Sequence, residues 1–210
     1  MSTEISGSRA RREKEKENMK SAILEAAIKI IAQEGYHKLS MRKIADAIEY
    51  TPTTIYSYYK DKAEIISDIS RQIRDKIISD VRIAMDENRG SPLENQLKIA
   101  FKAFLYSIAD CSEMGSAVIK SGMGTIFGPE DEAMPPENNG ILMLHGFLEL
   151  GQQQGIFRKL DNNISWMLVT ALIGFGLNSI ENKLHLNENW PHLVEVYTDM
   201  LVKGLLPGRA

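Results

Sequence analysis

The chain has 210 residues, of which 43% are hydrophobic and 25% charged, a balance that excludes intrinsically disordered and collagen-like proteins. It contains one cysteine, so neither an intrachain disulfide nor a cysteine-based zinc cluster can form. The net charge of −3 is unevenly distributed along the chain. Residues 1–62 contain more basic than acidic residues, whereas residues 63–210 contain more acidic than basic ones. An anionic partner for this basic part, or simply a solvated surface, would account for the asymmetry.

The N-terminal residues 1–18 contain no apolar run of the kind that a secretory signal requires. A cytoplasmic location, which also suits the single cysteine, is therefore the expectation. Two interpretations of this segment stay open: it lies along DNA phosphates or in a minor groove, or it is a solvated and partly disordered tail. Its basic residues are Arg9, Arg11, Arg12, Lys14 and Lys16.

The chain is predicted to be all-α, because apolar residues recur at helical spacing and no stretch alternates as a strand would. Gly35 is expected to end the first helix in a left-handed conformation. The glycine- and proline-rich residues 122–140 have no predicted regular structure. The expected helices cover residues 22–34, about nine residues from 41, a short stretch from 52, about 25 residues from 62, a stretch from 92, 112–121, 141–154, 164–183 and 191–205.

Three of these helices begin with clear start signals. Each signal combines a capping side chain with a proline at the first helical position, a glutamate at the third, or both. The three are Thr51 with Pro52, Asp61 with Glu64, and Ser91 with Pro92 and Glu94.

Residues 40–62 have the layout of a DNA-reading helix-turn-helix, with a short helix, a three-residue turn and a second short helix. Such a recognition helix enters the major groove by its N-terminal end, so the residues predicted to face base edges are Pro52, Thr53 and Thr54. The residues predicted to hold phosphates are Tyr56, Tyr58 and Lys62. A helical corner with aromatic packing is the alternative interpretation.

Residues 22–66 resemble the N-terminal DNA-binding domain of the TetR family of transcriptional regulators. The residues that carry the resemblance are Gly35-Tyr36, Ser40, Ile44-Ala45, Thr54-Ile55-Tyr56, Tyr58-Tyr59 and Lys62. Residues 151–158 are similar to the segment that precedes the dimerisation helices of that family. By position, the resemblance implies DNA contacts at Arg42, Thr51, Pro52, Thr53, Thr54, Tyr56, Ser57, Tyr58 and Lys62.

The turn of the motif departs from the family pattern, which usually has glycine where this chain has Glu49. A non-glycine residue in a left-handed turn costs roughly 1 kcal/mol, so we expect either a strained turn or a different one. The family also often has other residues near Thr53 and Ser57, which leaves the operator sequence undetermined.

The resemblance further implies that the C-terminal domain binds a small-molecule effector. Taken singly, each candidate wall residue is better explained as ordinary helical core. The candidates are Phe101, Phe104, Met114, Met123, Phe127, Met143, His145, Phe147, Trp166 and Asn178.

Residues 162–180 carry no charge, and their length alone would permit a membrane span. Their asparagines, serines and glycines oppose this, so we expect a helix buried on more than one side and no membrane association. Gly174 and Gly176 would admit a second helix, and with the C-terminal helix this segment would form the four-helix interface of a homodimer.

Signals of an enzyme are weak. Glu34 and His37 match half of a di-iron motif, but Gly35 interrupts the helix between them. Pro191 likewise breaks a metal-ligand spacing formed by His185, Glu188, His192 and Glu195. No metal and no cofactor are expected, and an all-α metal- or cofactor-dependent enzyme stays as the alternative function.

The sequence thus predicts an all-α chain of two domains. Residues 1–64 would form an N-terminal arm and a three-helix helix-turn-helix DNA-binding domain, and residues 65–210 a helical ligand-binding and dimerisation domain. The predicted function is that of a ligand-responsive transcriptional repressor. It would bind a palindromic double-stranded DNA operator as a homodimer and be released by a small apolar or amphipathic effector.

Overall fold

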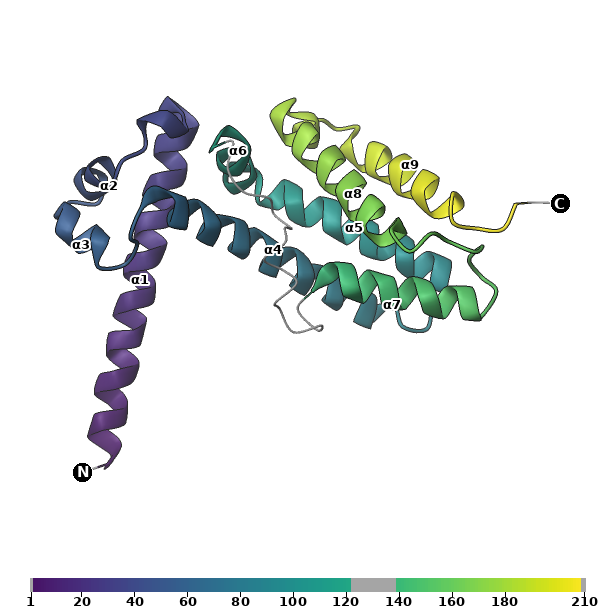
Figure 1. Ribbon diagram of the computed structural model, residues 1–210, viewed down its shortest axis with the longest axis horizontal. Helices are drawn as coiled ribbons and strands as arrows, with labels where there is room; N and C mark the ends of the chain where they lie inside the picture. Colours follow the sequence, from purple (N-terminus) through teal and green to yellow (C-terminus); the bar gives the residue numbers. More distant parts are fainter. Residues whose placement is uncertain (1, 122–138, 209–210) are drawn as a thin grey trace. The chain divides into compact units, whose positions relative to one another are not determined.

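The computed structural model describes residues 2–121 and 139–208, and this part of the chain is helical without strands (Figure 1). The prediction of an all-α fold is confirmed. The chain divides into two compact units: one comprises Met1–Ser70 and Ser116–Gly124, and the other comprises Arg71–Gly115 and Thr125–Ala210.

The first unit contains the predicted helix-turn-helix. Its elements are α1 (Ser2–Glu34), the 3-10 helix η1 (Tyr36–Lys38), α2 (Met41–Ala47), α3 (Pro52–Tyr56) and the first turns of α4 (Lys62–Glu87). α2 packs against α1 and α3, as Figure 1 shows. Isoleucines from all four helices form the core and are fully buried: Ile23, Ile31, Ile44, Ile55, Ile65 and Ile69. Because a helix of five residues is unstable alone, this packing is what maintains α3.

Helix α1 begins at Ser2, well before the predicted start at residue 22. The added turns consist largely of arginine, lysine and glutamate, which are strong helix formers. Arg11 Nε donates a hydrogen bond of 3.0 Å to Glu15 Oε1 one turn later. Residues 9–18 are exposed, so the segment is solvated, but the expectation of a disordered tail is wrong for these residues.

The turn between α2 and α3 is left-handed at Glu49, with φ at 60°. Tyr50 N donates to Ala45 O at 2.9 Å, and Glu49 N donates to Asp46 O at 3.4 Å. This is the Schellman pattern, which normally places glycine at the left-handed position. The chain therefore keeps the glycine-type turn with a strained glutamate in it.

Two of the three predicted helix starts have the expected caps. Thr51 Oγ1 accepts a hydrogen bond of 3.2 Å from Thr54 N, and Asp61 Oδ1 accepts one of 2.9 Å from Glu64 N. The cap expected at Ser91 is wrong, because α5 (Leu93–Asp110) begins after Pro92 with no side-chain cap. The Ser91 carbonyl instead accepts a hydrogen bond of 2.7 Å from the Gln96 side-chain amide.

The second unit is a helical bundle around α5. Its other elements are the rest of α4, α7 (Gly140–Gln153), α8 (Ile164–Glu181), η4 (Leu184–Leu186) and α9 (Trp190–Lys203). α6 (Ser112–Ser121) follows α5 directly and is divided between the two units, the first of which takes it from Ser116 onwards. α5 packs against α8 and α9, and α8 also packs against α7 (Figure 1). The ends of α7, α8 and α9 lie within two residues of the predicted ends.

Helix α8 contacts α5 through Gly176. A side chain at this position would bring a Cβ within 2.9 Å of Ile108 Cγ2, so the close approach depends on glycine. The expectation that Gly176 admits a helix from a second chain is therefore wrong, because α5 of the same chain occupies that place. Gly174 differs, since a Cβ there would meet nothing within 4 Å.

An ionic network joins α5 to α9. Lys98 Nζ lies 2.8 Å from Asp199 Oδ1 and 2.5 Å from Glu195 Oε1. Glu195 also pairs with Lys102, and Asp199 pairs with Lys203 at 2.5 Å. Hydrogen bonds from Lys203 and Lys98 lower the pKa of Asp199 from its ordinary 3.8 to about 2.

Among the described residues, α8 is one helix long and apolar enough to cross a membrane by length and composition alone. A single helix of this kind is weak evidence for a membrane span, because core helices of soluble proteins have the same property. In this structure α8 packs against α5, α7 and η4.

Candidate DNA-binding site and effector cavity

The N-terminal end of α3 is accessible and has the chemistry of a major-groove reader. Thr51 caps the helix, and Pro52 and Thr53 follow it with their side chains exposed. Thr54 is half-buried, with its hydroxyl 3.0 Å from that of Thr51. The methyl and hydroxyl of Thr53 and the ring of Pro52 are thus presented at the end of a helix, where base edges can be contacted.

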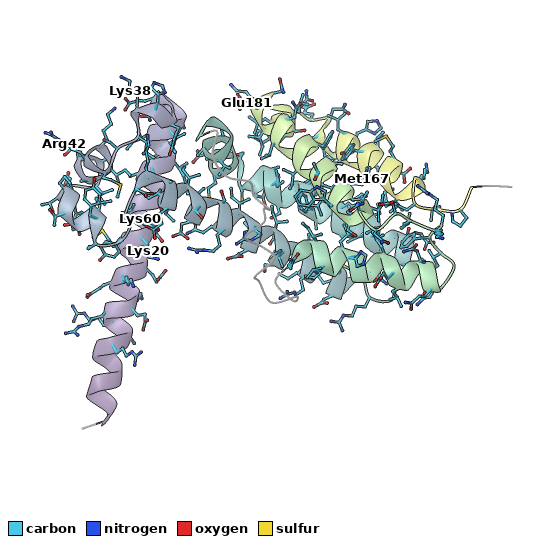
Figure 2. All side chains as sticks on the ribbon, in the orientation of Figure 1. Lys20, Lys38, Arg42, Lys60, Met167 and Glu181 are labelled. Atoms are coloured by element: carbon cyan, nitrogen blue, oxygen red, sulfur yellow. The ribbon has the colours of Figure 1, made fainter. Side chains whose placement is uncertain are left out.

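Exposed polar side chains surround this helix end. Tyr56 is 57% exposed at the end of α3, and Arg42 extends from α2 into solvent (Figure 2). Ser57 is exposed, but its hydroxyl donates a 2.6 Å hydrogen bond to Thr54 O. Tyr56 and Arg42 therefore have the accessibility that phosphate contacts need.

Tyr58 and Lys62, which are predicted from their spacing to hold phosphates, are less accessible than Tyr56 and Arg42. Tyr58 is half-buried. Lys62 Nζ lies 4.2 Å from the centre of the Tyr36 ring and donates to the carbonyls of Tyr36 and Leu39, each at 3.4 Å. The ammonium group of Lys62 is thus bound within its own unit, where it satisfies carbonyls around η1.

Two lysines outside the predicted set belong to the same surface. Lys60 is exposed in the turn after α3, and Lys20 Nζ lies 5.6 Å from the centre of the Tyr59 ring (Figure 2). Lys60 stands inside the motif and could have been included from its position. Lys20 could not, because its link to the turn arises only from the packing of α1.

The second unit contains a cavity of about 130 Å³. Four helix segments line it with side chains that are all apolar. They contribute Ile77, Ile78, Val81 and Met85 from α4; Leu97, Ala100, Phe101 and Phe104 from α5; Gly140, Met143, Leu144 and Phe147 from α7; and Val169 and Leu172 from α8. A cavity with such walls suits a hydrocarbon group.

The structure brings four of the predicted effector residues together around this cavity: Phe101, Phe104, Met143 and Phe147. The other described candidates are not in its lining: Met114, His145, Trp166 and Asn178. His145 Nε2 lies 3.3 Å from Glu149 on the α7 surface, and Trp166 is half-exposed. Met123 and Phe127 lie outside the described residues.

Sequence reasoning missed the contribution of α4 to the cavity. Its isoleucines have the spacing of any amphipathic helix, and nothing local distinguishes residues that border a cavity from those packed in the core.

An apolar surface follows α8 and α9 in the second unit. Met167 on α8 and Met200 on α9 are each 59% exposed. Trp166, next to Met167, and Val196, one turn before Met200, are exposed as well. Met167 is labelled on α8 in Figure 2. Phe175 is not part of this open surface, because its ring stacks on Tyr197 at a centroid distance of 4.0 Å.

The residues of the weak metal motifs have other partners. Glu34 pairs with Lys43, and Glu195 belongs to the ionic network on α9. Within residues 2–121 and 139–208, no group of three histidine, cysteine, aspartate or glutamate side chains is placed to hold a metal ion.

Comparison with known proteins gives a consistent picture. Residues 23–69 match the family model described as "Bacterial regulatory proteins, tetR family". The fatty acid metabolism regulator protein of Bacillus subtilis (strain 168) is 36% identical over 50 residues, which are 24% of this chain and 26% of that protein. The matched segment thus spans about a quarter of this relative.

The fold of the whole chain is similar to solved structures. A TetR family transcription regulator from Marinobacter aquaeolei VT8 superposes with a TM-score of 0.68 at 18% identity, covering 95% of this chain and 100% of that one. The fatty acid degradation regulator FadR from Bacillus halodurans superposes with a TM-score of 0.64 at 20% identity, covering 90% and 95%. These are transcription regulators and not enzymes.

Proposed function

The chain belongs to the tetR family of bacterial regulatory proteins, and from this premise we propose that it is a ligand-responsive transcriptional repressor. It binds a palindromic operator as a homodimer and is released by a small apolar or amphipathic effector. Residues 1–64 serve as its DNA-binding domain and residues 65–210 as its ligand-binding and dimerisation domain, with the protein acting in the cytoplasm and without a cofactor.

The exposed N-terminal end of α3 is the observation that carries this proposal. Pro52 and Thr53 read base edges, while Arg42 and Tyr56 contact phosphates that position the helix. Thr51 and Ser57 support the helix through their hydrogen bonds with Thr54. Both are exposed and contact the sugar-phosphate backbone of the DNA. Tyr58, Thr54 and Lys62 have more restricted access and act at the edge of the interface.

The cavity in the second unit is the proposed effector site. Its apolar walls favour the hydrocarbon part of an effector, and the relatives from two Bacillus species are regulators of fatty acid metabolism and degradation. Helix α4 provides a route for the response, since Ile77 and Val81 line the cavity while Asp68, on the same helix, bonds to Tyr59 after α3. An effector releases DNA only if it binds the DNA-incompetent conformation more tightly.

DNA binding is tested by fluorescence anisotropy with the purified chain and duplexes from the region around its own gene. One duplex should bind with an affinity at least a thousandfold above that of unrelated DNA at the same salt concentration. Metal analysis of the same sample tests the alternative of a metalloenzyme. A stoichiometric metal together with equal affinity for all duplexes would contradict the proposal.

The effector site is tested with straight-chain fatty acids of increasing length, added to the DNA complex. Operator affinity should fall at saturation for the wild type and not for Ala100→Leu, whose added side chain occupies the cavity. Ala103→Leu is the matched control, because Ala103 lies on the same helix outside the lining. An effect that persists in Ala100→Leu as strongly as in the control would place the effector elsewhere.

A further inference from the structure

The first half of α1 forms a solvent-exposed helix that the helix-turn-helix core does not use. The core residues of α1 begin at Ile23, whereas residues 9–18 are all exposed. Residues 9–17 contain five basic and three acidic side chains. An exposed helix of this kind is stable only through its own propensity, so the way its charges are arranged bears on what it contacts.

The basic side chains of this helix are not evenly distributed around it. At about 100° per residue, Arg9, Arg12, Lys16 and Lys20 lie on one face, since they are spaced at i, i+3, i+7 and i+11. We call these four residues the basic stripe. At 1.5 Å per residue, the stripe is about 16 Å long.

The remaining charges lie off the stripe. Glu13 and Glu17 follow one edge of it, and Glu15 lies beyond the other edge, where it is bound to Arg11. Arg11 and Lys14 lie on the opposite face of the helix. The four basic side chains therefore form one positive line along the helix, bordered by acidic side chains on both edges.

The stripe joins the candidate DNA-binding surface at its C-terminal end. Lys20 lies over the ring of Tyr59, and Tyr59 is followed by the exposed Lys60 just after the recognition helix α3. The stripe thus continues, along α1, the positive surface of the helix-turn-helix within the same unit.

Other occupants fit this face poorly. Residues 8–18 contain no leucine, isoleucine, valine or aromatic residue, so they lack the apolar seam of a coiled coil and the apolar face of a membrane-binding helix. A regular line of phosphates is the partner that a helix with one basic face and no apolar face can bind.

We propose that the basic stripe binds the sugar-phosphate backbone of the operator duplex, beside the segment read by α3. It extends the protein's footprint on the DNA and contributes affinity without sequence preference. This inference rests on the proposed function, because it requires that the helix-turn-helix binds DNA.

The experiment compares two double variants of the full-length chain that lose the same residue types and the same charge. Arg12→Ala with Lys16→Ala removes two members of the stripe, whereas Arg11→Ala with Lys14→Ala removes two basic residues from the opposite face. Alanine preserves the helix, which circular dichroism verifies. Operator affinity is then measured by anisotropy between 50 and 200 mM salt.

In the stripe variant, the slope of log K against log salt concentration should become less negative by about 1.8, that is by about 0.9 for each lost phosphate contact. Its affinity should fall about tenfold less over this salt range than that of the wild type. The control variant should retain the slope of the wild type.

Equal changes in both variants would show a general effect of net charge and overturn the proposal, as would an unchanged slope in the stripe variant. A wild-type chain that binds no duplex specifically would instead refute the proposed function itself, so the two failures are distinguishable.

Discussion

The hydroxyl of Tyr59 donates a 2.5 Å hydrogen bond to the carboxylate of Asp68, and both side chains are buried. This bond connects the turn after α3 with α4. Replacing Tyr59 by phenylalanine keeps the ring but removes a buried bond to a charged group, which should lower the free energy of unfolding by about 1–3 kcal/mol. Urea denaturation measures this, with Tyr50→Phe at a half-exposed position as the control. Equal stability of the two variants would show that the bond contributes nothing.

Local signals in the sequence predicted much of the first unit, because they act over only a few residues. Thr51 and Pro52 define the start of α3 whatever surrounds them, and Glu49 lies in the left-handed turn that the motif requires. The failures concern contacts between distant segments. Lys62 meets the carbonyls of Tyr36 and Leu39 only once the chain has folded, and the cavity side of α4 depends on where α5 and α7 pack.

The strained turn gives a second prediction. Replacing Glu49 by glycine should raise the free energy of unfolding by about 0.5–1 kcal/mol, because relief of the left-handed strain exceeds the added entropy of the unfolded chain. Denaturation midpoints at constant m-value measure the gain. Ala47→Gly, at the last residue of α2, should instead destabilise slightly, because it adds entropy to the unfolded chain without relieving any left-handed strain. A loss of stability in Glu49→Gly would show that the glutamate side chain makes a compensating contact.

The division of roles on α3 is testable by sequence preference. Tyr56→Phe should weaken binding to all duplexes by about the same factor, because it removes a phosphate contact. Thr53→Ala should change the ranking of operator variants, with about 1–3 kcal/mol of discrimination lost at one base pair. Anisotropy against a set of single-base operator variants separates the two patterns. The assignment fails where both substitutions alter the ranking alike.

The network around Lys98 predicts a dependence of stability on pH. Because the pKa of Asp199 is lowered from 3.8 to about 2, its ionised form stabilises the fold above pH 4, and this contribution disappears as pH falls through 2. Lys98→Met should therefore lower Tm at pH 5, and its difference from the wild type should shrink towards pH 2. Lys159→Met, at an exposed position, is the control. A difference independent of pH would mean that Lys98 acts by packing alone.

The apolar surface on α8 and α9 predicts the oligomeric state. Met200→Glu places a charge where a second copy would bury an apolar side chain, so it should give monomers at micromolar concentration that have lost operator affinity. The loss follows because only a dimer can set two recognition helices about 34 Å apart, one for each half-site.

Phe175→Glu would be a poor choice for this test, since it breaks the stack with Tyr197 inside the chain. Ile83→Glu on α4, at a position exposed to a similar degree, controls for the effect of a new surface charge. Light scattering measures the mass, and circular dichroism verifies folding. A wild-type monomer that still binds a palindrome tightly would contradict both the interface and the geometry on DNA derived from it.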